Sequence, residues 1–209
     1  MKKIFALQIS LLVLISIGGA AVFYYDVYDD IHDTIVSTLC LSCIKLDPIS
    51  NLEFTFETGN NEPHAEFVLK NLTTGIVFIE YRTDVCAACD DMAPIVKDIF
   101  KVSFEKEDTL YKEVNYNGTT VHFYHINLDH ATQEQKDSFP VYDKDVRQGV
   151  PMFVVATVNY HRGLIEPYYT TAYGTVGKTT EEGRKLFLES MIDDGLKFYD
   201  LNSAGYKYP

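Results

Sequence analysis

The sequence predicts an α/β fold in which a central mixed β-sheet is flanked by helices. The run IVFIEY at 76–81 is almost wholly apolar, branched or aromatic, which is typical of a central strand buried on both faces. Apolar residues then recur at helical spacing from 86 to about 104. Further strand-like runs follow at 121–128 and 151–158. Strands that alternate with helices in this way favour a sheet with helices packed on its faces.

The other predicted elements are less regular. Residues 105–120 form a polar excursion that ends in a turn at Asn117-Gly118. The final helix opens at Thr179-Thr180 with a capping-box pattern. The remaining predicted elements are a strand at 52–58, a helix at 64–72, a weak helix at 130–139, and a strand at 166–174 that pairs antiparallel with 151–158.

An apolar run at 4–25 follows two lysines at the N-terminus. A spanning helix needs about 20 apolar residues, so this run is long enough to be a transmembrane anchor. The lysines favour an orientation with the amino end inside. Small residues at 18–21 leave a second interpretation open, a cleaved signal peptide. Both interpretations place everything after residue 25 outside the cytoplasm, either as a single-pass membrane protein or in secreted form.

The chain is therefore predicted to have four parts. They are an anchor or signal peptide at 1–25, a juxtamembrane segment with Cys40 and Cys43 at 26–60, a folded domain at 61–200, and a tail at 201–209.

Composition excludes some partners. The chain has 209 residues, of which 46% are hydrophobic, and a formal net charge of −12. Nucleic acid is excluded as a partner because phosphate binding requires a basic patch. The histidines have no metal-ligand spacing, and structural or surface roles are predicted for them; they lie at 32, 64, 122, 125, 130 and 161.

Four cysteines form two Cys-x-x-Cys pairs, Cys40 with Cys43 and Cys86 with Cys89. Such pairs are compatible with a zinc site, with two structural disulfides, or with a redox site and an accessory pair. Zinc is disfavoured because 42 residues separate Cys43 from Cys86, whereas zinc ribbons use about 15 to 20. Cys86 stands where a strand leads into a helix, and the helix N-terminus favours the thiolate form of cysteine.

Four landmarks around the second pair carry a resemblance to the thioredoxin superfamily. Glu80 lies six residues before Cys86, Pro94 lies eight residues after it, Val150-Pro151 opens a later strand, and Gly174 ends the next one. The resemblance covers roughly residues 64 to 197. It implies a thioredoxin-like fold and a cis peptide bond before Pro151.

The resemblance also implies catalytic roles. Cys86 is the expected nucleophile and Cys89 the expected resolving thiol, while Glu80 is the buried acid that exchanges a proton with Cys89 through water. Pro151 is expected to keep metal ions away from the two sulfurs. No cofactor and no metal is expected.

Substrate contacts are expected at Val150, Ala87 and Ala88. The backbone of Val150, held by Pro151, is placed to pair with a substrate strand. Ala87-Ala88 matches neither the reducing nor the oxidising members of the family, so the direction of electron flow stays open.

Other positions depart from the family pattern. Val85 replaces the usual aromatic residue before the first cysteine, and the acid is glutamate rather than aspartate. Three aspartates, at 84, 90 and 91, surround the pair. Their negative charge disfavours a thiolate at Cys86 and favours a more reducing potential, although Asp90 and Asp91 also suit the first turn of a helix.

The predicted function is an extracytoplasmic thiol–disulfide oxidoreductase that acts on protein thiols or disulfides. Cys40 and Cys43 are either an inert pair or an accessory redox pair that exchanges electrons with Cys86 and Cys89, in a position that suits a relay from a membrane partner. The alternative is a thioredoxin-fold interaction subunit of a membrane assembly, with structural cysteines; the loss of the aromatic residue before Cys86 favours it.

Overall fold

The computed structural model describes residues 54–58, 63–161, 164–177 and 179–208. The predicted anchor at 4–25, the pair Cys40 and Cys43, and most of the segment at 26–60 lie outside these residues. None of the helices described is long and apolar enough to cross a membrane.

A mixed five-stranded sheet with the order β2-β3-β1-β4-β5 forms the centre of the fold. The central strand β1 (Ile76–Arg82) runs parallel to β3 (Thr119–Asn127) and antiparallel to β4 (Met152–His161). One edge is β2 (Leu110–Tyr116), antiparallel to β3, and the other is β5 (Leu164–Tyr173). Every residue of β1 is buried, which confirms the prediction of a central strand covered on both faces.

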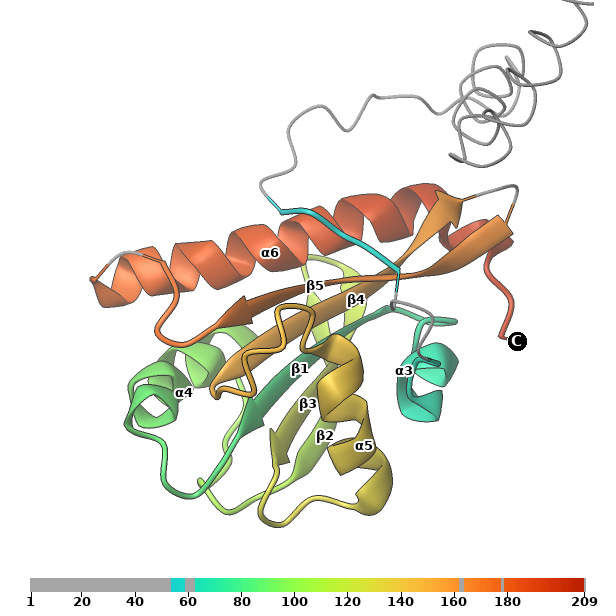
Figure 1. The fold of residues 1–209 in the computed structure, drawn as a ribbon. Helices are drawn as coiled ribbons and strands as arrows, with labels where there is room; N and C mark the ends of the chain where they lie inside the picture. The colour runs from blue at the N-terminus through green and yellow to red at the C-terminus, as the bar shows by residue number, and fades with distance from the viewer. Residues whose placement is uncertain (1–53, 59–62, 162–163, 178, 209) are drawn as a thin grey trace, which may run out of the picture. The chain divides into compact units, whose positions relative to one another are not determined.

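Four α-helices surround this sheet (Figure 1). They are α3 (Glu66–Asn71), α4 (Ala87–Phe100), α5 (Gln133–Tyr142) and α6 (Glu181–Asn202), and a short 3-10 turn at Ser203–Gly205 follows.

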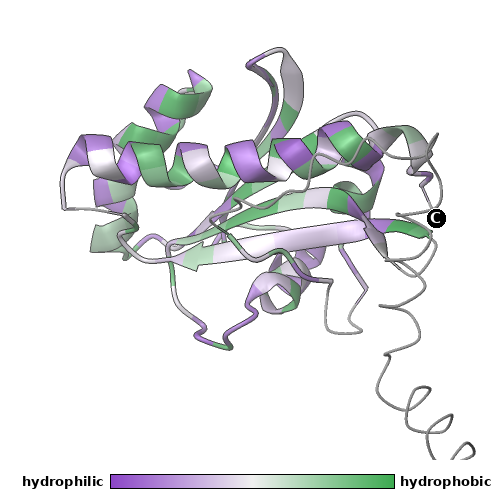
Figure 2. Ribbon diagram, turned by 90° about the horizontal axis from the view of Figure 1, so that it is seen from above, coloured by the Kyte–Doolittle hydropathy of each residue, from purple (hydrophilic) through white to green (hydrophobic). Residues whose placement is uncertain are grey.

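The helices cover both faces of the sheet. Phe78 of β1 contacts the ring of Phe100 in α4, whereas Tyr81 of β1 forms a hydrogen bond of 2.6 Å with Ser138 of α5. Alternate residues of a strand point to opposite faces, so α4 and α5 lie on opposite sides. On the α4 side lies α6, in which hydrophobic and hydrophilic stretches alternate along the helix (Figure 2). The mixed sheet and its flanking helices confirm the predicted α/β fold.

The polar excursion predicted at 105–120 is wrong in part, because it contains the strand β2. Most side chains of β2 are exposed, so an edge strand with few buried side chains lacks the apolar alternation that predicts a strand. The turn at Asn117-Gly118 is confirmed, and both residues have positive φ, 52° and 91°. The turn joins β2 to β3 as a hairpin.

Two smaller predictions also need correction. Within 54–58, only Glu57 pairs with a strand, as an isolated bridge to Tyr169. The helix predicted to reach about 104 ends at Phe100, because Lys101 takes a left-handed conformation with φ of 53°.

The capping box predicted for the last helix is incomplete. Thr180 accepts a hydrogen bond from the backbone of Gly183, but glycine has no side chain to return the bond. A complete box occurs instead at Thr132 and Gln135, at the start of α5.

Candidate functional site

Cys86 and Cys89 form a disulfide at the start of α4, with an S–S distance of 2.02 Å. Cys86 is the N-cap residue of the helix, and its Sγ accepts a hydrogen bond of 3.1 Å from the backbone N–H of Cys89. A helix N-terminus leaves N–H groups without intrahelical partners, and it favours negative charge. The sulfur of Cys86 is thus placed where a thiolate is stabilised.

The two cysteines differ in access to solvent. Cys86 is partly exposed, whereas Cys89 is completely buried. An attacking thiolate must be reached by its substrate, so the geometry allows Cys86, and not Cys89, to meet an external disulfide. Ala87 and Val85 beside it are exposed, and Val85 reaches 95% exposure. Ala88 is partly buried.

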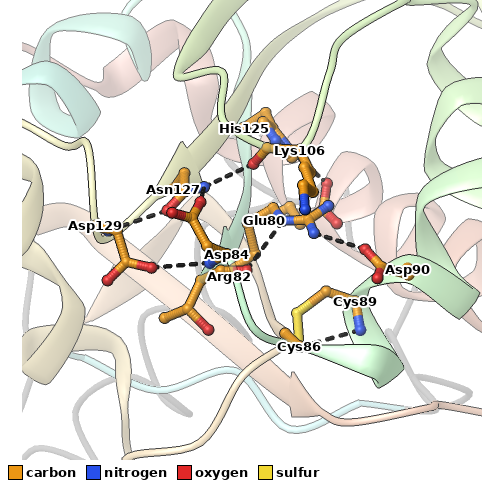
Figure 3. The surroundings of a disulfide bond; sticks show 11 residues. Glu80, Arg82, Asp84, Cys86, Cys89, Asp90, Lys106, His125, Asn127 and Asp129 are labelled. Atoms are coloured by element: carbon orange, nitrogen blue, oxygen red, sulfur yellow. Dashed lines mark hydrogen bonds and ion pairs between the residues drawn. A yellow bond between two sulfur atoms is a disulfide. The ribbon is translucent and has the colours of Figure 1, made fainter.

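Glu80 lies near the end of the central strand β1 and has no exposed surface. It pairs in register with His125 of β3, and its Oε2 lies 2.9 Å from His125 Nδ1. Figure 3 shows this pair in the surroundings of the disulfide. The structure thus brings the predicted acid into the interior near the cysteines, and it adds a histidine that sequence reasoning assigned to structural or surface roles.

Arg82 is a second buried charge beside the disulfide. Only 1% of its side chain is exposed, and its Nη2 donates a hydrogen bond of 2.7 Å to Oδ1 of Asp90 in the first turn of α4 (Figure 3). Removing one partner of a buried ion pair leaves the other charge uncompensated, which strongly destabilises the folded protein. Asp90 lies in the first turn of α4, one of the two roles expected for it, and Arg82 offsets its negative charge.

Asp84 is also tied into a network. Its Oδ1 accepts a hydrogen bond of 2.7 Å from Nδ2 of Asn127, and its carboxylate lies 3.1 Å from Nε2 of His130. The pKa of Asp84 lies below its ordinary value, chiefly because of the hydrogen bond from Asn127 and also because of His130 and the charge of Lys106, while desolvation opposes the shift. The predicted crowding of negative charge is therefore partly compensated.

The peptide bond between Val150 and Pro151 is cis, as the resemblance implied. Met152 pairs with Tyr81, so Pro151 lies at the end of the sheet where β1 leads toward Cys86. The carbonyl of Pro151 accepts a hydrogen bond of 2.8 Å from the N–H of Gly174, which has a φ of 70°. These positions form one end of the sheet together with the disulfide.

The loop before Pro151 is held by one buried carboxylate. Asp143 accepts hydrogen bonds from the backbone N–H groups of Arg147 and Gln148, at 2.9 and 2.7 Å, and from the hydroxyl of Tyr173 at 2.7 Å. Val146 and Gln148 both have a φ of 52°, a conformation that is uncommon for residues other than glycine. Asp143 therefore fixes the chain that leads to Val150.

A metal site is absent from the part of the chain that the structure describes, where no group of three or more His, Cys, Asp or Glu side chains could hold an ion.

Sequence reasoning missed Arg82, His125 and Asp143. Arg82 had a signal, since a charged residue at the end of an otherwise apolar run is unusual unless it is paired. His125 becomes recognisable only from the register of β1 and β3, which no local pattern specifies.

No family model matches the chain, and no curated protein matches its sequence. The oxidised thioredoxin from Plasmodium falciparum is a similar solved structure, with 18% identity and a TM-score of 0.33, over 62% of this chain and 93% of that one. A point mutant of thioredoxin from Halobacterium salinarum has 17% identity and a TM-score of 0.30, over 63% of this chain and 96% of that one.

The chain's own structure agrees with the thioredoxin-like fold that the sequence resemblance implied. It has a mixed sheet flanked by helices, a Cys86–Cys89 pair at the start of α4 and a cis bond before Pro151.

Proposed function

We propose that this protein is a thiol–disulfide oxidoreductase that exchanges disulfides with protein substrates. The observation that carries the proposal is the asymmetric pair at the start of α4, in which Cys86 is accessible and Cys89 is buried. A disulfide with only a structural role requires neither a helix N-terminus at its accessible sulfur nor a buried carboxylic acid nearby.

In the reducing direction, the Cys86 thiolate attacks one sulfur of a substrate disulfide. A bond forms between Cys86 and that sulfur, and the substrate's S–S bond breaks. The other substrate sulfur leaves with the electron pair and takes up a proton. The N–H groups at the start of α4 stabilise the attacking thiolate.

Cys89 then resolves the mixed disulfide. Its thiol gives a proton to Glu80, and the resulting thiolate attacks Cys86. The Cys86–Cys89 bond forms, and the substrate sulfur departs as a second thiolate, so that two electrons have passed from the protein to the substrate. The oxidising direction is the reverse of these steps.

The substrate is proposed to lie along Val150, whose backbone is presented by the cis bond, and against the exposed Ala87. We also propose that this chemistry takes place outside the cytoplasm, where disulfides persist. That location rests on the apolar run at 4–25 alone.

The test is turnover of a protein disulfide. With insulin and a dithiol as reductant, the wild-type chain should accelerate insulin reduction, and Cys86→Ser should not. Cys89→Ser should instead trap a mixed disulfide at Cys86 that is stable until a reductant is added. Wild-type protein that behaves like Cys86→Ser would contradict the function and favour a scaffold with structural cysteines.

The direction of electron flow is read from the reduction potential of the Cys86–Cys89 couple, measured against glutathione. A value of about −270 mV indicates a reductant, and a value of about −120 mV indicates an oxidant.

A further inference from the structure

Glu80 and His125 form an isolated, buried acid–base pair. Both side chains have no exposed surface, and one hydrogen bond of 2.9 Å joins Oε2 of Glu80 to Nδ1 of His125. Each has a second polar atom, Glu80 Oε1 and His125 Nε2, that is buried and has no hydrogen-bond partner among the described residues. Buried polar atoms without partners are rare in native structures, and a redox or catalytic role is one of the known reasons for them.

The walls around the pair are mostly apolar. The ring of Phe104 stacks on His125 with centroids 3.9 Å apart. The register places Phe153 of β4 opposite Glu80, and Leu110 of β2 opposite His125. A net charge in such surroundings is costly, because little water remains to solvate it.

The charged and titratable groups nearby come from several parts of the fold (Figure 3). Besides the pair itself, the labelled ones are Arg82 from β1, Asp84 from the loop after it, Cys86, Cys89 and Asp90 from the start of α4, Lys106 from the segment before β2, and Asp129 from the segment after β3. Arg82 is paired with Asp90, and Asp84 with Asn127. The hydrogen-bonded partner of Glu80 is therefore His125 and not one of these charges.

We propose that Glu80 and His125 hold the catalytic proton as one unit, with His125 as the positioning residue. This inference rests on the proposed function, because the proton is the one that Cys89 gives up. Before transfer the unit consists of a carboxylate and a neutral imidazole whose Nδ1–H donates to Oε2. The thiol of Cys89 then protonates Glu80 through Oε1. The unit becomes neutral while the negative charge moves to the sulfur of Cys89.

Two roles follow for His125. The hydrogen bond from His125 occupies Oε2 of Glu80 and leaves Oε1, which has no partner among the described residues, as the oxygen that accepts the proton. It also stabilises the carboxylate form without placing a permanent positive charge in the core, since imidazole can be neutral at physiological pH.

The test separates the two chemical steps in the full chain, with Cys40→Ser and Cys43→Ser present in every variant. Reduced protein is mixed with 5,5′-dithiobis(2-nitrobenzoate) in a stopped-flow instrument. The first coloured thiolate released reports attack by Cys86, and the second reports resolution by Cys89. Both rates are measured from pH 5 to 9 in wild type, His125→Asn, Glu80→Gln and the double variant, a range that spans about two units on either side of neutrality.

His125→Asn is the matched variant, because its amide N–H can occupy the position of Nδ1–H but does not titrate. Glu80→Gln should slow the second phase roughly 100-fold, in the range for loss of a general acid–base group. His125→Asn should slow the second phase about tenfold at pH 7 and change its pH profile. The first phase should stay within about twofold of wild type. In the Glu80→Gln background, His125→Asn should have little further effect, because its role passes through Glu80.

Several results would overturn the inference: a second phase with the wild-type pH profile in His125→Asn, equal slowing of both phases, or an undiminished His125→Asn effect beside Glu80→Gln. If the histidine variant does not fold, nitrogen NMR shifts of the His125 ring in wild type replace it. The shifts must show a neutral ring with its proton on Nδ1 at pH 7, and any other protonation state overturns the inference. If wild type shows neither phase, the proposed function itself fails.

Discussion

His64 lies between the rings of Tyr142 and Tyr169, with centroids 5.7 and 5.9 Å away. Its Nδ1 is 3.3 Å from the hydroxyl of Tyr142. Burial lowers the pKa of His64 from 6.5 to about 4, because the charged imidazole loses solvation. The folded protein therefore keeps this histidine neutral at pH values where the unfolded chain binds a proton.

The sign of the effect on stability follows from this difference. Between pH 6.5 and about 4 the unfolded state binds more protons, so the stability due to neutral His64 is fully present above pH 6.5 and is lost as the pH falls toward 4. At pH 5 the loss relative to pH 7 should be on the order of 2 kcal/mol. Urea unfolding at both pH values should show this loss in wild type.

His64→Phe keeps a ring in the same place but does not titrate. Its free energy of unfolding should change less between pH 7 and pH 5 than that of wild type, by about the same 2 kcal/mol. His64→Gln serves as a second variant if the phenylalanine destabilises the site. If the free energy of unfolding depends on pH equally in wild type and both variants, protonation of His64 does not destabilise the folded protein and the prediction is wrong.

At the residue scale, the resemblance to the thioredoxin superfamily singled out Cys86, Glu80 and Pro151, and the structure places these residues near one end of the sheet. Their catalytic roles stay predictions. The resemblance did not find the partner of Glu80. His125 lies 45 residues away and meets it only through the parallel register of β1 and β3.

At the scale of elements, Gly195 allows α6 to pack closely against the sheet. A Cβ added at Gly195 would lie 2.5 Å from Cγ1 of Val155 in β4, and the carbonyl of Gly195 accepts a hydrogen bond of 2.7 Å from Thr157. Glycine weakens a helix interior by about 1 kcal/mol relative to alanine. Here it permits close approach of the helix to β4.

Gly195→Ala should therefore destabilise the protein despite the better helix propensity of alanine. Overpacking costs about 1–3 kcal/mol, against about 1 kcal/mol gained in propensity, so a net loss on the order of 1 kcal/mol is expected. The measurement is the free energy of unfolding in urea. Leu186→Ala, at an exposed position of the same helix, should change stability by less than about 0.5 kcal/mol.

A double-mutant cycle tests the cause. Val155→Ala alone should destabilise by creating a cavity, and it should cost less in the Gly195→Ala background, where the new methyl group fills part of that space. Additive effects of the two substitutions would contradict direct contact between α6 and β4 as the reason.

The sequence predicts buried elements more clearly than exposed ones. The strands β1 and β4 have nearly continuous apolar runs and were located within a few residues. The edge strand β2 was missed, because its pairing with β3 is made by backbone groups while most of its side chains face solvent. The end of α4 was misplaced because Lys101 leaves the helix without a glycine or proline to mark the position.

At the scale of the whole molecule, the fold brings four distant segments to one end of the sheet. The loop after β1 carries Cys86, the start of β4 follows Pro151, the end of β5 leads to Gly174, and β3 supplies His125. The sequence predicted the order of these segments but not the strand register that joins them. The chain's net charge of −12 is a second property of the whole molecule, and it affects which substrates the protein attracts.

The acidity predicts a preference for basic substrates that depends on salt. Asp84, Asp90 and Asp91 lie next to the cysteines, and only Arg82 and Lys106 are basic among the labelled groups there. Exposed charges act over about 30 Å at 0.01 M ionic strength but only about 3 Å at 1 M. A peptide disulfide with several lysines should therefore react at least about tenfold faster than its glutamate counterpart at low salt.

The measurement is the second-order rate constant for oxidation of the reduced protein by three peptide disulfides that differ only in charge. The rate of the basic peptide should fall with added salt, that of the acidic peptide should rise, and the neutral peptide should stay nearly constant, so that the three converge near 1 M. Asp91→Lys, at an exposed position outside the disulfide, should reduce the low-salt preference because it reverses one charge at the approach to Cys86. A preference that persists at high salt would mean that specific contacts, and not the field of the acidic molecule, select the substrate.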